Sequence, residues 1–468
     1  MTDFEIYRSP YSWRYASSEM RKIWSEAHKR RLWRNIWVTL AEVQSEFGLA
    51  QPDQAADLRA HMDDIDVRRS LEIEAQIHHD LMAEVKTFAE QCPRGGGIIH
   101  LGATSVDVKD NATALQLREA LDLILGECRH LLGILSPMMR DLAEIPVMAY
   151  THLQPAEPTT LGYRLAQYAQ DLLADWENLR RVRRELRGKG FKGAVGTSAS
   201  YGELLGLENL TKFEALLSEK LDLLFYPVTT QTYPRKQEYE ILSVLAGLGA
   251  SLYKFAFDLR ILQSPPIGEL AEPFSRVQVG SSAMPFKRNP IRSEKIDSLA
   301  RMLAQFPRLA WDNAAHSLLE RTLDDSANRR TMLPEAFLIA DELLRVATAT
   351  LKGLQMNEKA MAHNMSVYGP FAATERLLNA LGKAGADRQQ MHERLREHTL
   401  QAWEATRAEQ PNPLAELIAA DPKFLEYLTV DELDSLMDAS AYVGDAPRRA
   451  QDFAQVILDK IGDGALVP

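Results

Sequence analysis

The densest group of chemically capable side chains is the segment from Gly280 to Pro290, which reads GSSAMPFKRNP. Hydroxyl groups, two cations and an amide stand close together there, and such groups can abstract a proton and neutralise a carboxylate. The glycine permits unusual backbone geometry, and the two prolines stiffen the far side. A polar surface loop is the competing interpretation, and chemistry alone favours a functional loop only slightly.

Two further segments carry residue types suited to catalysis or anion binding. In the segment 151–160, His152 and Gln154 occupy a proline-rich turn that we expect at a helix start, and a histidine there could act as acid or base near neutral pH. A capping turn with a bystander histidine is the simpler alternative. The segment 321–330 sets arginines beside hydroxyls, which suits phosphate recognition but equally suits a salt-bridged surface.

Long amphipathic helices must position these segments. Apolar residues recur at three- and four-residue steps, which predicts helices, over 111–144, 159–187, 236–262, 293–319 and 334–354. Pro137 is expected to kink the first helix without ending it. Helices this long need long partners, and signals for a sheet are almost absent, so the sequence predicts an all-α fold around a central bundle.

Breaks in the helical pattern divide the chain into three parts. We expect an N-terminal helical domain over residues 1–106, a central long-helix bundle over 107–356 and a C-terminal domain of shorter helices over 357–468. The stretch 264–290 is predicted to be a structureless loop between two long helices. A loop of that length is unusual enough to suggest a function.

Composition argues against several classes of protein. The 468 residues include 65 acidic and 54 basic side chains, a formal net charge of −11, which argues against coating nucleic acid or an anionic membrane. Two cysteines are too few for a disulfide framework or a cysteine-rich metal site. His78 and His79 are adjacent and would diverge on a helix, so no metal site is expected. Without a secretory signal or a membrane-length apolar stretch, we expect a soluble cytoplasmic protein.

The segment 280–290 resembles the G-S-S-x-M-P-x-K-x-N-P signature of the fumarase/aspartase superfamily, whose members eliminate fumarate from succinyl-type substrates. Its variable positions are similar to those of the adenylosuccinate lyases, and so are five segments in the same order along the chain, 13–17, 79–83, 100–105, 151–162 and 321–330.

This resemblance implies an all-helical homotetramer of three-domain subunits, with each active site shared among three chains. It also implies elimination of fumarate from adenylosuccinate, which leaves AMP, and from the succinylated aminoimidazole carboxamide ribotide of purine biosynthesis. No metal and no other cofactor is expected.

The resemblance also gives the catalytic residues their expected roles. By analogy Ser281 is the general base, as an alkoxide stabilised by nearby cations and donors. Lys287 and Asn289 are expected to neutralise the succinyl carboxylate as it gains negative charge. His152 is expected to protonate the departing nitrogen, and Glu294 to hydrogen-bond that histidine.

Contacts to the nucleotide are carried over in the same way. His79 is expected to contact the phosphate and to assist catalysis. The other expected substrate contacts are Arg14, Tyr15, His78, Asp80, Thr104, Ser105, Thr151, Gln231, Lys295, Arg321, Ser326 and Arg330. Two of these depart from the family pattern, because His78 stands where relatives have arginine and Lys295 where some do. Lysine keeps the charge but loses the bidentate geometry of arginine. The substrate affinity, or the preference between the two purine substrates, is therefore expected to depend on these two positions.

Two other interpretations stand beside an adenylosuccinate lyase. A superfamily lyase of the argininosuccinate lyase or carboxymuconate cycloisomerase type would not need the arginine-rich segment 321–330, because its substrate carries no phosphate. A catalytically inactive structural homologue would be expected to lose Ser281, His152 or Lys287, and all three are present. The sequence therefore predicts an active enzyme on purine nucleotides, with neither nucleic acid nor membrane as partner.

Overall fold

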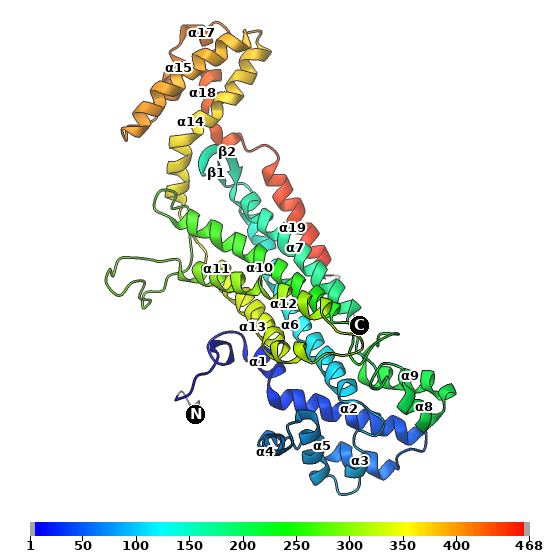
Figure 1. Ribbon diagram of the computed structural model, residues 1–468. Helices are drawn as coiled ribbons and strands as arrows, with labels where there is room; N and C mark the ends of the chain where they lie inside the picture. Colours follow the sequence, from blue (N-terminus) through cyan, green and yellow to red (C-terminus); the bar gives the residue numbers. More distant parts are fainter. Residues whose placement is uncertain (1–4, 463–468) are drawn as a thin grey trace.

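The computed structural model describes residues 5–462, and these residues are mostly α-helical. Its centre is a bundle of long helices that lie side by side along an elongated molecule (Figure 1). They are α6 (Ser105–Asp141), α7 (Leu161–Glu185), α10 (Lys236–Gln263) and α13 (Asp324–Lys352). The predicted all-α long-helix bundle is confirmed.

Local chemistry explains where the first long helices begin and how they pack. The Asp107 carboxylate accepts the Thr104 backbone N–H at 3.0 Å in a capping box that starts α6. Thr160 Oγ1 accepts the Tyr163 N–H at 3.3 Å and starts α7. Pro137 lies inside α6, as predicted. The apolar stripe of α6 is fully buried, including Leu121, Ile124, Leu131 and Leu132.

Two helix boundaries in the bundle differ from the prediction. The expected helix over 293–319 is divided into α11 (Ile291–Leu303) and α12 (Phe306–Ala315), because Pro307 is tolerated only in the first turn of a helix. The helix expected from Pro334 instead starts at Asp324 and contains that proline. Residues 324–330 of the arginine-rich segment therefore lie on the first turns of α13.

The segment around His152 is the tip of a β-hairpin, whereas we expected a turn at a helix start. β1 (Pro146–Thr151) pairs antiparallel with β2 (Gln154–Thr160), and α7 follows directly. His152 and Leu153 connect the strands with φ of 54° and 59°, the left-handed conformation that a two-residue type I′ turn requires. The sequence does not indicate a hairpin here, because this turn lacks the glycine or asparagine that usually marks a type I′ turn.

Shorter elements cover one end of the bundle (Figure 1). The N-terminal helices are η1 (Pro10–Ser12), α1 (Ser18–Ile23), α2 (Glu26–Glu46), α3 (Pro52–Ala60), α4 (Val67–Ile77), α5 (Asp80–Gln91) and η2 (Gly96–Ile98). Between α7 and α10 lie α8 (Ala199–Leu205), η3 (Leu207–Asn209) and α9 (Leu210–Leu221), and α9 packs against α2. Cys92 and Cys128 are both buried and unpaired.

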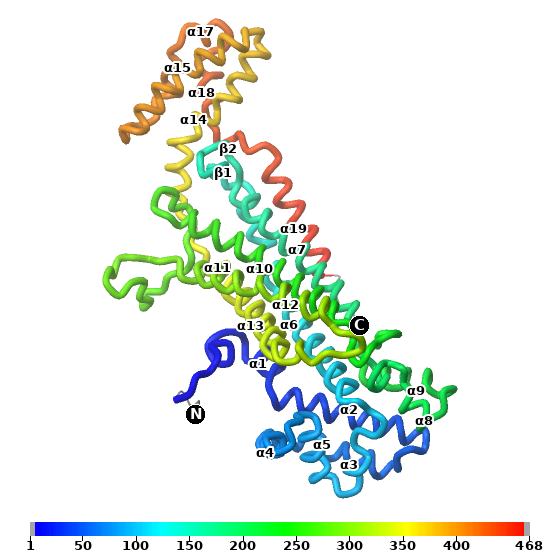
Figure 2. Tube along the Cα trace, viewed as in Figure 1, coloured from blue at the N-terminus to red at the C-terminus, as the bar shows by residue number. Residues whose placement is uncertain are grey.

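The C-terminal part contributes to two hydrophobic cores. One surrounds Leu377, Phe424 and Leu433 within α14 (Glu358–Lys383), α15 (Arg388–Arg407), α16 (Leu414–Ala419), α17 (Pro422–Leu425), α18 (Val430–Met437) and η4 (Ala439–Ala441). With 26 and 20 residues, α14 and α15 are longer than the short helices we expected. The last helix, α19 (Ala446–Gly462), returns along the bundle and packs on α6 and α7 (Figure 2).

Helix α10 occupies the interior of the bundle. Of the helices in residues 5–462, it alone is long and apolar enough to cross a membrane. It packs against α7, α11, α12 and α13, so burial within the bundle accounts for its apolar character.

Candidate active site

The loop between α10 and α11 projects from the body of the molecule (Figure 1). It is irregular except for β3 (Leu270–Ala271), which pairs with β4 (Gln355–Met356) near its start. At the neck of the projecting part, Asn289 Nδ2 donates to the Gly280 carbonyl at 2.9 Å. A Cβ at position 280 would lie 2.1 Å from the Lys287 carbonyl oxygen, so this close approach requires glycine.

The expected base and its cation lie on this projecting loop. Ser281 Oγ accepts the backbone N–H of Met284 at 3.1 Å, which closes a tight turn. Lys287 is exposed, and among residues 5–462 its ammonium has no ion-pair partner. The loop therefore presents a hydroxyl that already accepts two backbone N–H donors, from Ala283 at 3.4 Å and from Met284, together with a cation that has no ion-pair partner among the described residues. Both groups are available to a ligand or to another chain.

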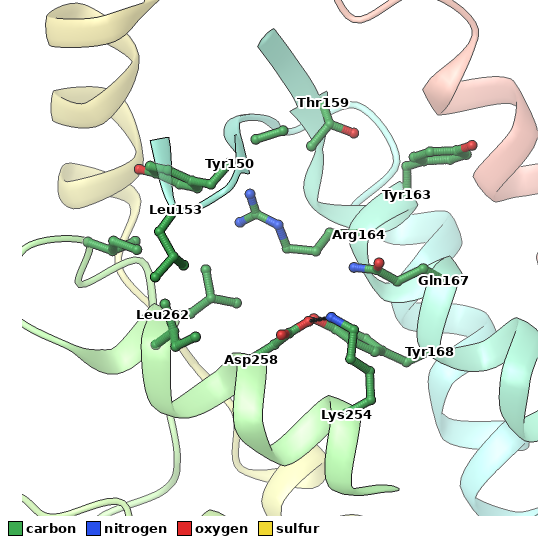
Figure 3. Close-up of a pocket in the computed structure, with 13 residues that line it drawn as sticks. Tyr150, Leu153, Thr159, Tyr163, Arg164, Gln167, Tyr168, Lys254, Asp258 and Leu262 are labelled. Atoms are coloured by element: carbon green, nitrogen blue, oxygen red, sulfur yellow. Dashed lines mark hydrogen bonds and ion pairs between the residues drawn. The ribbon is translucent and has the colours of Figure 1, made fainter. Parts of the chain in front are cut away.

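The expected general acid lies elsewhere, at the hairpin tip. Thr151, His152 and Leu153 are all exposed there. Leu153 lines a cavity of about 320 Å³ between the hairpin, α7 and α10, whose polar wall includes Arg164, Lys254 and Asp258 (Figure 3). The cavity lining contains none of the residues predicted for the site. It is therefore not, by itself, the predicted active site.

Hydrogen-bonded side chains form one wall of this cavity (Figure 3). Tyr168 donates to Asp258 at 2.8 Å, and Arg164 pairs with the buried Glu269 at 2.7 Å. Burial and the Glu269 carboxylate raise the pKa of Tyr150 to about 12, so its hydroxyl stays protonated at neutral pH.

A second, smaller cavity of about 170 Å³ brings three expected contacts together. Asp80 at the start of α5 and Ser326 and Arg330 on α13 all line it. Asp80 pairs with Lys109 at 2.5 Å and with Arg330 at 3.5 Å. Burial would raise the pKa of Asp80, but Lys109 and then Arg330 outweigh it and lower the pKa. Lys109 is not among the contacts expected from the sequence, although it lies four residues after Ser105 and so shares a face of α6 with it.

The two adjacent histidines occupy the junction of α4 and α5. His78 ends α4 in the left-handed conformation, with φ of 53°. His79 caps α5, since its Nδ1 accepts the Met82 N–H at 3.2 Å. Both side chains are exposed beside Asp80, so His79 is placed to reach a ligand at the smaller cavity.

The remaining expected contacts lie at helix ends and in loops. Thr104 and Ser105 start α6, where the helix dipole favours a negative group. The Gln231 N–H donates to the Glu320 carbonyl at 3.1 Å, so this glutamine lies next to the arginine-rich segment. Arg321 in that segment pairs with Asp325 at 3.0 Å.

A buried charge network holds these segments on α6. Arg235 pairs with Asp110 at 3.0 Å and with Asp325 at 2.7 Å, while Arg329 donates to Glu238 at 2.9 and 2.5 Å. Burial would raise the pKa of Glu238, but Arg329 and Arg235 reverse the effect and lower the pKa. Sequence reasoning missed the network because its members are far apart along the chain.

Two of the expected substrate contacts, Arg14 and Tyr15, lie in the segment before α1. Tyr15 lies beside α11, with the Lys295 ammonium 5.9 Å from its ring centre, and the Arg14 guanidinium lies 5.7 Å from the Trp13 ring centre.

Glu294, also on α11, is 3.8 Å from Arg260. Among residues 5–462, the His152 side chain has no hydrogen bond or ion pair, and the expected hydrogen bond between His152 and Glu294 stays a prediction.

One chain thus keeps the predicted site residues in separate places. The hairpin, the projecting loop and the α4–α5 junction lie in different regions of the elongated chain (Figure 1). The individual roles assigned to these residues stay predictions. In residues 5–462, no group of three His, Cys, Asp or Glu side chains could hold a metal ion.

The fold has close counterparts among solved structures. 3-Carboxy-cis,cis-muconate lactonizing enzyme from Pseudomonas putida superposes with a TM-score of 0.84 at 25% identity, covering 96% of this chain and 99% of that one. Fumarate lyase from Mesorhizobium sp. BNC1 gives 0.83 at 25% identity, with 96% and 99% covered. Residues 12–304 match the family model described as Lyase. Fold and signature loop together define a lyase of the fumarase/aspartase superfamily.

Closer relatives narrow the assignment. Adenylosuccinate lyase of Saccharomyces cerevisiae is 40% identical over 97% of this chain and 95% of its own length. That of Schizosaccharomyces pombe is 39% identical with the same coverage, and that of Pyrococcus abyssi is 35% identical over 93% and 95%. Residues 370–453 match the model described as Adenylosuccinate lyase C-terminus. The chain belongs to the adenylosuccinate lyase family.

Proposed function

We propose that the chain is a carbon–nitrogen lyase that eliminates fumarate from adenylosuccinate, leaving AMP, and from the succinylated aminoimidazole carboxamide ribotide. The observation that most strongly supports this function is the 40% identity to an adenylosuccinate lyase over nearly the whole chain. The solved muconate enzyme shares the fold at 25% identity, so the sequence relationship favours the purine-nucleotide reaction.

The reaction poses two chemical problems. A weakly acidic proton must leave the carbon next to a carboxylate, and its electron pair forms the double bond of fumarate as the carbon–nitrogen bond breaks. In our proposal Ser281 takes this proton and His152 protonates the departing nitrogen. A serine hydroxyl is too weak a base in water, so the loop must close and stabilise an alkoxide. The Met284 N–H, which already donates to Ser281 Oγ, supports this role.

Cations in the proposed site complement the negative charges of the substrate. Lys287 and Asn289 would neutralise the succinyl carboxylate as it gains charge after proton removal. The cavity lined by Lys109, Ser326 and Arg330 offers cations and a hydroxyl to the phosphate, although Asp80 in the same lining already pairs with both cations. His79 lies 3.8 Å from Asp80. We assign the nucleotide phosphate to this cavity.

We also propose that the subunits form a homotetramer whose active sites combine residues of three chains. This assembly would bring the hairpin tip, the projecting loop and the phosphate cavity together, although they lie apart in one subunit. Large apolar side chains exposed on and next to α10, α11 and α12 support such contacts, notably Phe257, Met302, Trp311, Leu318 and Leu319.

The unpaired state of both cysteines supports our proposal of a cytoplasmic location.

Turnover assays with competing substrates test the function. We expect the purified protein to release fumarate from adenylosuccinate, followed by ultraviolet absorbance, and to leave argininosuccinate and carboxymuconate unchanged. Release of fumarate from argininosuccinate alone would assign the chain to another lyase activity. Inactivity on both purine substrates and on the two competitors would contradict the enzyme assignment and favour a structural role.

A further inference from the structure

The segment before α1 is anchored to α13 through its backbone. The Ser17 N–H donates to Asp341 Oδ2 at 2.5 Å, and the Ser17 hydroxyl donates to Asp341 Oδ1 at 2.9 Å. The preceding N–H, from Ala16, donates to Glu342 Oε2 at 3.0 Å. Two consecutive carboxylates of one helix thus hold two consecutive amide groups of a segment more than 300 positions away.

The anchored backbone has an uncommon conformation. Ala16 has φ of 66°, a region that non-glycine residues adopt only when neighbouring contacts impose it. The Glu342 hydrogen bond is made by the N–H of this same residue. Asp341 and Glu342 are 0% and 5% exposed, so water cannot replace them easily as acceptors. The conformation at position 16 therefore depends on the two carboxylates.

Glu342 also reaches the neighbouring helix α11. Its Oε1 pairs with Lys295 at 2.9 Å, and its Oε2 pairs with Arg345 at 3.1 Å. Lys295 in turn lies over the Tyr15 ring. One buried carboxylate therefore fixes the relative placement of the segment 14–17 and α11.

A third acidic residue, Glu127, lies beside this pair. Burial and the Asp341 carboxylate raise the pKa of Glu127, on α6, to about 8. Burial also raises the pKa of Asp341, while the hydrogen bonds from Ser17 act in the opposite direction and favour its carboxylate form.

We propose that Asp341 and Glu342 are positioning residues that hold Arg14, Tyr15 and Lys295 in the arrangement that receives the nucleotide. This inference rests on the proposed function, because the substrate contacts of these three residues come from it. Asp341 and Glu342 are buried and already occupied by protein donors, so they act on the substrate only through the residues they hold.

Steady-state kinetics of Asp341→Asn and Glu342→Gln test the positioning role. Each amide keeps the size of the carboxylate but replaces one of its two acceptor oxygens by an NH2 group, so one of the donors held by each carboxylate loses its acceptor and the anchor is weakened. Because the segment binds substrate and transition state alike, we expect KM for adenylosuccinate to rise about tenfold with kcat within about threefold of wild type. A wild-type KM in both variants would overturn the proposal, as would a fall in kcat at unchanged KM.

Two further variants keep the test decisive if the amide variants fold poorly. Ser17→Ala removes the hydroxyl bond to Asp341 together with the bond that Ser17 Oγ accepts from the Met20 N–H at 3.1 Å at the start of α1, and it is expected to raise KM about threefold. Glu335→Gln is the matched control, since Glu335 also lies on α13 but accepts from Ser9, outside the anchored segment, and its KM should not change. A wild-type KM for Ser17→Ala would overturn the proposal.

The same assays separate this inference from the proposed function. Failure of the wild-type protein to release fumarate would contradict the function itself. Normal wild-type turnover with unchanged KM in the Asp341, Glu342 and Ser17 variants would contradict the positioning role alone.

Discussion

Ser281→Ala is expected to lower kcat for fumarate release by about a thousandfold, within the range of 10²–10⁴ for loss of a general base. The hydroxyl is the only group of this side chain that can take the carbon-bound proton, and alanine removes it. Stopped-flow or steady-state measurement of fumarate absorbance gives the effect directly. The fold should survive, because the residue lies on a projecting loop outside both hydrophobic cores.

The adjacent serine provides a control for this substitution. Ser282 is exposed on the same loop, and Ser282→Ala removes a hydroxyl of the same kind from the neighbouring position. We expect Ser282→Ala to keep kcat within about threefold of wild type. Equal losses in both variants would point to loop structure, and an active Ser281→Ala would contradict the assigned base while leaving the function intact.

Arg329→Met is expected to lower the free energy of unfolding by about 3–5 kcal/mol, the cost of leaving a buried charge without its partner. Glu238 lies 1% exposed in the middle of the protein and accepts hydrogen bonds from the Arg329 guanidinium. Its other close cation, Arg235, is already shared by Asp110 and Asp325. Urea denaturation followed by circular dichroism measures the difference.

The next residue along the chain is the matched control. The Arg330 side chain is 63% exposed, so Arg330→Met should change stability by no more than about 0.5 kcal/mol. We expect it instead to raise KM, because Arg330 lines the proposed phosphate cavity. Equal destabilisation by the two substitutions would contradict the different roles given to these neighbours.

The long helices were predictable because the apolar residues of their buried faces recur at three- and four-residue steps along the sequence. The helices α6, α7 and α10 begin and end close to the expected positions, and even Pro137 falls inside α6. The hairpin at His152 was not predictable, since its turn residues are a histidine and a leucine held at positive φ by strand pairing. The expected helix over 293–319 is two helices in the structure. The apolar pattern runs through both of them, and only Pro307 indicates that a second helix begins there.

The candidate site was only partly predictable for a different reason. Motifs identified the loop 280–290, the histidine pair and the arginine-rich segment, but nothing in the order of residues distinguishes Arg329 from Arg330. On a helix adjacent side chains point about 100° apart, so Arg329 enters the buried network at 12% exposure while Arg330 stays 63% exposed, although both line the smaller cavity. The roles of Lys109, Asp341 and Glu342 likewise depend on contacts between distant segments.

In the proposed enzyme, catalytic groups from different subunits act on one substrate. Mixing inactive Ser281→Ala with inactive His152→Gln, under conditions that exchange subunits, tests whether one site combines groups from two chains. If Ser281 and His152 of one site come from different chains, random assembly restores about one quarter of the sites, and fumarate release from adenylosuccinate should return to about that level. A mixture that exchanges subunits and stays as inactive as its parents would contradict the shared site, because it would place both groups on the same chain.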